Sequence, residues 1–553
     1  MTEQASNPPV LNHDQVRAKL LAREEVALID LREEHPFAQG HPLFAVQLSA
    51  GRIELDAPWR LPRRNACIVL YDNGEGLVAG AAQVMDALGY TAVHQLEGGL
   101  AGWIAAGGEV FIDVNVPSKA FGELVEHERN TPSLPAEEVK ALIDQGADMV
   151  VLDVRRFDEY TTMSIPSGTS VPGAELLLHV RDLAPNPATK VIVNCAGRTR
   201  SIIGTQSLVN AGVPNPVAAL RNGTIGWTLA GQALDHGQLR RFGHVSAPNL
   251  AQARQSAQAL ADRAGAYRLD AAGLAAWRAD KTRTLYCWDV RTPEEYEAGH
   301  WQGFGSAPGG QLVQETDVNA AVRGARIALC DGGSAADGVR AAMTAHWLAQ
   351  LGWQVGWLDA PGPGLFTDGA HDAAAIAAGL VLAEGPWRPP FAPLPDVGLV
   401  NPAEAAELLN QVGTLLLDFA ASGRHVKAHV PGARWVLRAQ QATWLPTAAA
   451  AKRVLCTSTE GRLACLAAAD LSRALGRPVQ ALAGGTAAWA AEGRTLQSGE
   501  GGLLSERIDR YRRPYEGTDA PRAAMQAYLD WEFGLVAQLA RDGTHGFRVL
   551  PAG

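Results

Sequence analysis

The sequence predicts an α/β protein made of four tandem copies of one unit, each built on a parallel sheet. Four apolar segments end in an aspartate, namely Asp30, Asp153, Asp289 and Asp418. Each is followed by a second apolar segment and a loop, and the loops open with Asp72, Cys195, Asp331 and Thr457. The interval between the two positions is 42, 42, 42 and 39 residues, which indicates one unit repeated four times. Strands that alternate with helices at this spacing are typical of βα units in a parallel sheet.

The first expected strand of each unit ends in a short charged motif. These strands are 27–30, 150–153, 286–289 and 415–418, and the first three continue as Asp-x-Arg through Arg32, Arg155 and Arg291. A turn with His41, His300 or His429 follows in three units, whereas the second unit has 163–166 there and no histidine. Because these residues recur in units without a loop cysteine, we expect structural roles for them. The histidines are expected to form structural hydrogen bonds, and Arg155 to pair with a nearby acid such as Glu159.

The second half of each unit predicts a strand, a helix and a closing turn. The strands are 68–71, 191–194, 327–330 and 453–456. The alanine-rich helices are expected over 78–88, 202–211, 339–351 and 463–475, and each is followed closely by glycine, as helix ends commonly are. Closing turns with a tryptophan occur at 96–103, 220–227 and 482–489, and the third copy, at 358–366, is degraded. We expect Trp227 to serve packing within its unit.

Three apparent linkers set the expected domain boundaries. They run over 113–134, from about 241 to 262, and over the proline-rich 385–393. The expected units are therefore 8–112, 132–241, 262–372 and 396–497. The remaining segment, 503–553, is expected to be a helical appendix packed on the last unit, with its helix over 522–539 and its charges on a solvated face.

Composition limits the classes of function. The chain has 553 residues, 47% of them hydrophobic, and a net charge of −10, which argues against binding to nucleic acid or to an acidic membrane. No apolar stretch is long enough to span a bilayer, and residues 1–10 lack a signal-peptide pattern. Six cysteines without a CxxC pair suit a reducing compartment, so we expect a cytoplasmic protein. The histidines show no metal-ligand spacing, and we expect no metal and no cofactor.

Cys195 stands between a buried strand and the start of a helix, in a loop that contains Arg198 and Arg200 and no acid. A helix N-terminus and two guanidinium groups both favour the thiolate, and such sites lower a thiol pKa from ~8.5 to about 3.5–7.5. The backbone N–H groups of such a loop can also hold a small oxyanion. We therefore expect a cysteine nucleophile that acts on a small anionic substrate; the alternative is a buried structural cysteine. We expect the other cysteines to lie in the core or in strand and helix context, namely Cys67, Cys287, Cys330, Cys456 and Cys465. A competing interpretation makes Cys456 the reactive cysteine of the fourth unit.

The Asp-x-Arg strand end, the Gly-His turn, the Cys195 loop and the Gly-Gly-x-x-x-Trp closure together resemble the rhodanese-like sulfurtransferase family over nearly all of residues 10–497. The resemblance implies a five-stranded parallel sheet with helices on both faces in each unit. It also implies that Cys195 carries sulfane sulfur as a persulfide. Its cradle would be the backbone N–H groups of Ala196, Gly197, Arg198, Thr199 and Arg200. Arg198 and Arg200 would then hold the anionic group of the donor.

The loop length and charge narrow the choice of sulfur donor. Related phosphatases and arsenate reductases use C-x5-R, whereas Arg200 makes this loop C-x4-R, a narrower cradle that favours sulfur over phosphate transfer. Two arginines favour the thiosulfate dianion over mercaptopyruvate, whose enzymes in the family typically carry a neutral loop. We expect a ping-pong reaction in which Cys195 takes sulfur from thiosulfate, releases sulfite, and passes the sulfur to a thiol, a protein acceptor or cyanide.

The other three loops lack the required thiol. Asp72 and Asp331 offer carboxylates and Thr457 an unactivated hydroxyl, so we expect one active and three inactive units. The alternative function is a sulfur-relay or scaffold protein whose Cys195 accepts sulfur from glutathione persulfide or from a partner's persulfide. The doubly basic loop favours the first hypothesis, and the three retained but disabled copies favour the second.

Overall fold

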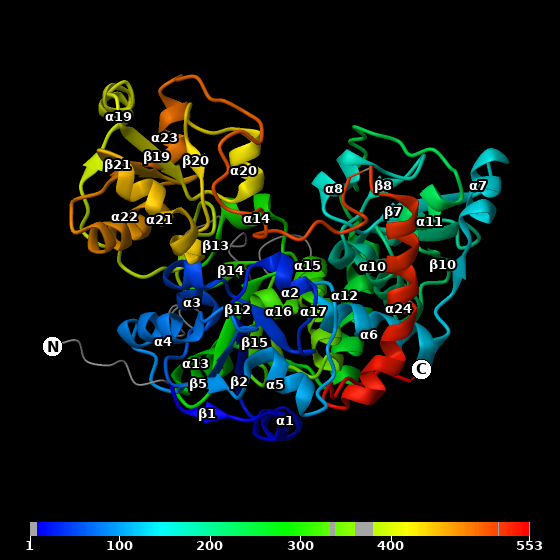
Figure 1. Cartoon of the computed structure of the whole chain (residues 1–553). Coiled ribbons are helices and arrows are strands. Elements are labelled where there is room, and N and C mark those ends of the chain that lie inside the picture. Colours follow the sequence, from blue (N-terminus) through cyan, green and yellow to red (C-terminus); the bar gives the residue numbers. More distant parts are fainter. Residues whose placement is uncertain (1–7, 332–337, 360–379, 518, 552–553) are drawn as a thin grey trace.

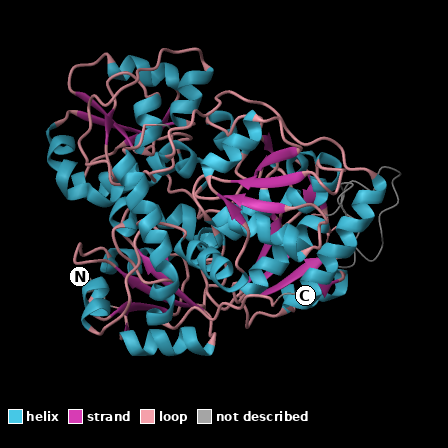
Figure 2. Cartoon of the chain, turned by 90° about the vertical axis from the view of Figure 1, so that its right-hand side faces the viewer, coloured by secondary structure: helices cyan, strands magenta, loops and turns pink. Residues whose placement is uncertain are grey.

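The computed structural model describes residues 8–331, 338–359, 380–517 and 519–551. Within these residues it contains four five-stranded sheets, and every strand pair in them is parallel. Counting strands within each unit, the order is always first, fifth, fourth, second, third. The predicted fold class is therefore confirmed, and Figures 1 and 2 show the strands of each sheet flanked by helices. The domain bounds given above stay predictions, but each range contains one complete sheet.

The first unit forms the blue part of Figure 1. Its strands are β1 (Val10–Leu11), β2 (Val26–Asp30), β3 (Ala45–Gln47), β4 (Cys67–Tyr71) and β5 (Val93–Leu96). Its helices are α1 (His13–Ala22), α2 (Glu34–Ala38), α3 (Ile53–Arg60), α4 (Val78–Ala87) and α5 (Gly99–Ala105), with a 3-10 turn η1 (Ala50–Arg52).

The second unit contains the cysteine loop. Its strands are β6 (Ser133–Leu134), β7 (Met149–Asp153), β8 (Thr169–Ser170), β9 (Lys190–Asn194) and β10 (Val217–Leu220). Its helices are α7 (Ala136–Asp144), α8 (Phe157–Thr162), α9 (Leu176–Leu183), α10 (Thr199–Asn210) and α11 (Gly223–Leu229), with a 3-10 turn η2 (Gly173–Glu175). The chain enters this unit through α6 (Val116–Arg129) and leaves it toward α12 (Ala247–Ala264).

The third and fourth units repeat the arrangement. The third has β11 (Tyr267–Leu269), β12 (Leu285–Asp289), β14 (Gly305–Ser306), β15 (Arg326–Cys330) and β16 (Gln354–Leu358), with an added antiparallel pair, β13 (His300–Trp301) and β17 (Leu382–Ala383). Its helices are α13 (Ala271–Ala279), α14 (Pro293–Ala298), α15 (Gly309–Gln314), α16 (Thr316–Asn319) and α17 (Val339–Gln350). The fourth has β18 (Leu399–Val400), β19 (Thr414–Asp418), β20 (Arg434–Trp435), β21 (Arg453–Thr457) and β22 (Gln480–Leu482). Its helices are α19 (Pro402–Leu409), α20 (Ser422–Lys427), α21 (Gln441–Ala450), α22 (Arg462–Leu475) and α23 (Gly485–Ala491), with a 3-10 turn η4 (Arg438–Gln440).

Two of the three predicted linkers are helices of the core, which corrects the prediction. The region 113–134 contains α6, whose Phe121 and Val125 are buried, and the region 241–262 contains most of α12. Helix α12 packs on α17 through Ala253, Ala257 and Ala261, small residues spaced so that they share one face. The charged and polar side chains of α6 and α12 resembled a solvated linker. Pro117 near the start of α6 and Gly265 after α12 are nevertheless helix-boundary signals.

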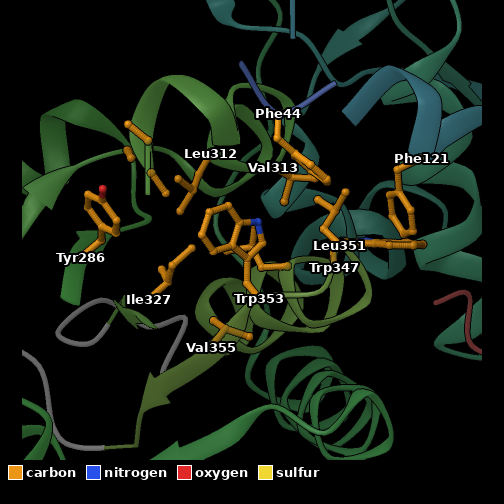
Figure 3. Packing of buried hydrophobic residues seen from close by; sticks show 14 of the residues in the cluster. Phe44, Phe121, Tyr286, Leu312, Val313, Ile327, Trp347, Leu351, Trp353 and Val355 are labelled. Carbon is orange, nitrogen blue, oxygen red and sulfur yellow. The ribbon is translucent and has the colours of Figure 1, made fainter. Parts of the chain in front are cut away.

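The hydrophobic core joins units that are distant in sequence. Phe121 of α6 lies with its ring centroid 5.9 Å from that of Trp347 on α17, and 5.4 Å from that of Phe547 in the C-terminal segment. Phe44 of the first unit contacts Phe547 in turn, and Figure 3 shows Phe44, Phe121 and Trp347 close together. The first three units and the C-terminal segment therefore share one core, whereas the fourth unit has apolar clusters of its own.

The C-terminal helix α24 (Arg522–Asp542) confirms the predicted helix but not its predicted position. It packs against α6 and α11 rather than on the fourth unit, and Figure 1 shows it in red beside α6. Met525 and Leu529 form an apolar cluster with Ile225 of α11. The helix thus covers the second unit, where the cysteine loop lies.

Candidate functional site

Cys195 follows the end of β9, which lies between β7 and β10 in the middle of its sheet. The loop 195–198 leads directly into α10, so the thiol stands at the carboxyl end of the strands and beside a helix N-terminus. Ligands of parallel α/β sheets commonly bind at this edge. The sequence placed the cysteine, the loop and the helix correctly.

The carbonyl groups of the loop are held by α11. The backbone N–H of Thr224 donates to the Cys195 carbonyl at 2.9 Å, and that of Ile225 donates to the Ala196 carbonyl at 3.0 Å. Gly223, at φ +54°, lies so close that a side chain there would collide with the Cys195 carbonyl oxygen. With the carbonyls fixed, the N–H groups of residues 196–200 donate no hydrogen bond to any described residue. The loop therefore presents a set of unpaired donors, as an anion cradle requires.

The Cys195 thiol is buried, and its surroundings favour the protonated form. Cys195 is 2% exposed, and its Sγ donates to the Ser201 hydroxyl, 3.3 Å away, which in turn donates to the Arg198 carbonyl. Burial raises the pKa of the Cys195 thiol, and the Arg200 charge and the Ser201 hydrogen bonds lower it by a smaller amount. The predicted lowered pKa is therefore wrong for this conformation, because removal from water outweighs the positive charge.

Arg198 is turned toward carboxylates. Its guanidinium donates to both oxygens of Glu123 on α6, at 2.7 and 2.8 Å, and also pairs with Glu126. It donates to the Asn222 side chain at 3.0 Å and lies over the ring of Phe533. These contacts join the loop to α6 and α24. The prediction that this side chain is open to an anionic donor is not matched by its contacts.

Arg200 is paired as well, with Glu159 of α8. Both hydrogen bonds of this bidentate pair are 2.8 Å long, and the Arg200 charge lowers the pKa of Glu159 to about 2 against the effect of burial. Arg340 and Glu295 form the same bidentate contact in the third unit, which has Asp331 in place of the cysteine. The pair therefore belongs to the fold, although the Arg200 charge still acts on the thiol.

A cavity of about 420 Å³ adjoins Arg200 between the second unit, α15 and the C-terminal segment. Basic side chains line it, namely Arg155, Arg156, Arg200, Arg510, Arg512 and Arg513, together with Asp158, Glu159 and Glu516. Cys195 is absent from its lining. The cavity leads to the basic side of the loop rather than to the sulfur.

The C-terminal segment covers the sulfur side. Tyr528 and Glu532 of α24 lie against Gly197, where an added methyl group would be 3.1 Å from the Tyr528 ring and 3.4 Å from the Glu532 carboxyl. Lys119 of α6 holds this segment, because its ammonium group lies within 5.5 Å of the ring centroids of Tyr515, Tyr528 and Trp531. Its charge is balanced by Asp113 at 2.8 Å. Sequence reasoning missed this cover, although Tyr528 and Trp531 on the predicted helix 522–539 were a signal of a packed face.

In each of the other three loops, a side chain of the loop accepts hydrogen bonds from nearby backbone N–H groups. The Asp72 carboxylate accepts from the backbone N–H groups of Gly74 at 3.0 Å and Leu77 at 2.6 Å. The Asp331 carboxylate accepts from those of Arg340 and Ala341, at 2.7 and 3.1 Å. In the fourth unit, the Ser458 hydroxyl accepts from the N–H of Ala464 at 3.3 Å. In these three units a loop side chain accepts hydrogen bonds from backbone N–H groups near the start of the following helix.

The Asp-x-Arg motif is a buried structural ion pair. Arg155 pairs with Asp153 two residues before it, at 2.7 Å, and not with Glu159 as predicted. Arg32 with Asp30 and Arg291 with Asp289 repeat this pair. The fourth unit, which lacks the arginine, uses His425 on Asp418 at 2.7 Å instead. The motif therefore fixes the end of the second strand of the unit.

The predicted structural roles of the turn histidines and of Trp227 are confirmed. His41 contacts the carbonyls of Pro42 and Asp113, and His300 and His429 contact those of Tyr296 and His425. Trp227 is fully buried and donates to the Ala233 carbonyl.

The remaining cysteines lie mostly in the interior. Cys330, Cys456 and Cys465 are buried in apolar clusters, whereas Cys67 and Cys287 are half-buried. Burial, Cys465 and Asp470 all raise the pKa of the Cys456 thiol, and no cation among the described residues lowers it as Arg200 does for Cys195, so Cys456 does not suit a rival carrier.

Across the described residues, no group of three or more His, Cys, Asp or Glu side chains has an arrangement that could hold a metal ion. None of the helices in the described part of the chain combines the length and apolar character of a membrane span.

The fold and the loop define an α/β protein of repeated parallel-sheet units with a cysteine at the ligand-binding edge of one of them. The rhodanese-like domain pattern matches residues 13–106, 135–230 and 401–492, and the chain belongs to this family. The third unit lies outside these matches but has the same strand order.

The chain is similar to proteins named thiosulfate sulfurtransferase. The crystal structure of one from Pseudomonas aeruginosa is 58% identical, has a TM-score of 0.93, and covers 98% of this chain and 100% of its own. A thiosulfate sulfurtransferase from Azotobacter vinelandii is 26% identical over 222 residues, which is 36% of this chain and 80% of that protein. A second one from Pseudomonas aeruginosa is 26% identical over 235 residues, 35% of this chain and 86% of that protein.

Proposed function

We propose that this protein is a thiosulfate sulfurtransferase that carries sulfane sulfur as a persulfide on Cys195. The observation that carries the proposal is the set of unpaired backbone N–H groups of residues 196–200 around a cysteine at a helix N-terminus. Such donors stabilise both the persulfide anion and the charge that develops on a leaving oxyanion. The names of the similar proteins support the same activity.

The proposed mechanism has two half-reactions. The Cys195 thiolate attacks the outer sulfur of thiosulfate, and sulfite leaves with the electron pair of the broken S–S bond. A thiol, a protein acceptor or cyanide then attacks the terminal sulfur of the persulfide and restores Cys195. Arg200 favours the thiolate from its ion-paired position, and the N–H groups of Ala196 to Arg200 hold the anion. Arg198 adds positive charge while it joins the loop to α6.

The other three units are proposed to be inactive because their loops are already satisfied. A carboxylate or hydroxyl cannot form a persulfide. In the first and third units the carboxylate also accepts from backbone N–H groups, and in the fourth the neighbouring Ser458 hydroxyl does so. The expected domain bounds are kept in this proposal. We further propose that the protein acts in the cytoplasm.

The test is incubation of the full chain with thiosulfate, followed by intact-mass analysis and a sulfite assay. We expect the mass of one sulfur atom to be added at Cys195, with sulfite release. Cys195→Ser is expected to abolish both, whereas Asp331→Ala is expected to leave both in place. Sulfur bound at any other cysteine, or turnover by Cys195→Ser, would contradict the one-site proposal.

A second candidate is a sulfur relay in which the donor is a glutathione persulfide or a partner's persulfide. The pairing of both loop arginines with carboxylates favours the relay. A loop whose positive charges are already neutralised attracts the thiosulfate dianion less strongly. A panel of purified donors distinguishes the two. Fast transfer from persulfides with negligible transfer from thiosulfate would support the relay.

A further inference from the structure

Glu532 of α24 has an unusual position for a carboxylic acid. It is fully buried, and its Oε1 accepts hydrogen bonds from the hydroxyl groups of Tyr528 at 2.7 Å and Thr199 at 3.5 Å. Its Oε2 is buried too but has no hydrogen-bond partner among the described residues. An unpaired buried polar atom costs about 1–3 kcal/mol, so a native structure retains one where it has a use.

The unpaired oxygen lies over the cysteine loop. A methyl group added to Gly197 would be 3.4 Å from the Glu532 Oε2, so this oxygen is next to the second residue after Cys195. The N–H groups of residues 196–200 are unpaired at the same place. A ligand seated on the loop would therefore contact both the N–H donors and the Glu532 carboxyl.

Glu532 does not act as a substitute anion in this loop. In the first unit the Asp72 carboxylate fills its own loop by accepting from the N–H groups of Gly74 and Leu77. The Glu532 carboxyl accepts from none of the N–H groups of the Cys195 loop, although it lies beside them. The Glu532 Oε2 therefore remains available to accept a proton.

We propose that Glu532 is a further catalytic residue, which takes the proton of the Cys195 thiol and returns it to the departing sulfite. This inference rests on the proposed function. A buried thiol in a site with paired arginines needs a base, and Glu532 is an acid within reach of the ligand position. The C-terminal helix thereby supplies a chemical group to the second unit.

The step balances without an added oxidant or reductant. The thiol proton moves to the Glu532 carboxylate, and the Cys195 sulfur forms a bond to the outer sulfur of thiosulfate. The bond between the two thiosulfate sulfurs breaks, and its electron pair leaves with sulfite. Glu532 then protonates a sulfite oxygen. One thiol and one thiosulfate dianion become a persulfide monoanion and a hydrogen sulfite monoanion, and Glu532 returns to its starting state.

The electrostatic surroundings raise the pKa of both groups. Burial and the neighbouring Glu123 raise the pKa of Glu532 to about 8, while Lys119, Tyr528 and Arg198 act in the opposite direction. Burial also raises the pKa of the Cys195 thiol, and the charge of Glu532 contributes to this. A general base is most efficient when its pKa lies near the working pH, as that of Glu532 does.

The experiment compares Glu532→Gln with Asp530→Asn in the full chain. Both replace an acid of α24 by its amide, but Asp530 is exposed and its carboxylate accepts from Gln526 on the same helix. In a single turnover with thiosulfate, we expect Glu532→Gln to slow addition of sulfur to Cys195 by ~100-fold and Asp530→Asn to match wild type. Glu532→Asp should recover part of the rate. Equal melting temperatures of the Glu532→Gln and wild-type proteins would show that the fold is retained.

A second readout tests the coupling without sulfur transfer. The rate of iodoacetamide alkylation at Cys195, measured against pH with Cys195→Ser as background, should have a lower midpoint in Glu532→Gln because the neighbouring negative charge is absent. An unchanged midpoint, or an unchanged or faster sulfur-transfer rate, would overturn the role of Glu532 and leave the proposed function intact. If the wild-type protein takes no sulfur from thiosulfate, the proposed function fails and this catalytic role fails with it, whatever the alkylation shows.

Discussion

Arg200 and Glu159 form a bidentate ion pair beside the Cys195 loop, and Arg340 and Glu295 repeat it in a unit that has no cysteine. The repeat separates what the pair does for the fold from what it does for the thiol. In the second unit the pair joins α10 to α8, and in the third unit it joins α17 to α14. Only in the second unit does the arginine also face a sulfur atom whose ionisation it favours.

This relationship predicts opposite effects on stability and on thiol reactivity. Glu159→Gln removes the carboxylate that compensates Arg200, so the thiol pKa should fall and the alkylation rate of Cys195 at neutral pH should rise. The same change should lower the free energy of unfolding by roughly 1–3 kcal/mol. Glu295→Gln is the control, with a smaller loss of stability because Arg340 keeps Glu175 at 3.3 Å, and with no change at Cys195. An alkylation rate that changes equally in both variants would contradict the argument.

The self-filled loop of the first unit predicts a purely structural effect. Asp72→Ala leaves the backbone N–H groups of Gly74 and Leu77 without their acceptor, which should cost about 1–3 kcal/mol of unfolding free energy. Asp72→Asn keeps an acceptor oxygen and should cost less. Urea unfolding measures both, and sulfur transfer from thiosulfate should be unchanged in either variant. Loss of transfer in a folded Asp72→Ala protein would show that the first unit takes part in the chemistry.

The Lys119–Asp113 pair predicts how firmly the C-terminal helix is held. Both side chains are buried, at 1% and 3% exposure, so Lys119→Met leaves a buried carboxylate without its cation and should cost about 3–5 kcal/mol. Amide hydrogen exchange within Arg522–Asp542 should become faster. The double variant Lys119→Met/Asp113→Asn should regain most of the stability, because no charge is then left unpaired. Failure of the double variant to recover would mean that the aromatic contacts of Lys119 matter more than its charge.

The buried His346 predicts a loss of stability in acid. Burial lowers its pKa in the folded chain from 6.5 to about 3, so the unfolded chain binds the proton more tightly. The neutral histidine is therefore favourable above pH 6.5, and stability falls as the pH drops from 6.5 toward 3, by about 2 kcal/mol at pH 5. His346→Leu should reduce this pH dependence, measured by urea unfolding at pH 7 and pH 5. The exposed His236→Gln should leave it as in wild type.

Local patterns in the sequence were enough for the repeated unit. Apolar runs that end in Asp30, Asp153, Asp289 and Asp418 became the second strands of four sheets, and the four predicted helices after the loops begin and end within three residues of α4, α10, α17 and α22. The Cys195 loop was placed correctly for the same reason. These features depend on residues within one short segment, whose periodicity and glycine positions specify strand, loop and helix.

Those local patterns could not predict ion pairs between residues that are distant in the chain. Charged residues such as Lys119 and Glu123 resembled a solvated linker because a sequence shows the charge but not the partner that compensates it. The same holds for the loop arginines, whose carboxylates come from Glu123 and Glu159.

The sequence by itself determined four βα units, one cysteine among four equivalent loop positions, and the loop residues that follow it in the chain. Only the tertiary structure decided that this thiol is buried, that both arginines are compensated, and that Glu532, 333 residues beyond Thr199, lies against the loop. The physical reason is that secondary structure follows from interactions between near neighbours in the chain. Burial and charge compensation follow instead from which distant surfaces pack together, and these set the ionisation of the sulfur.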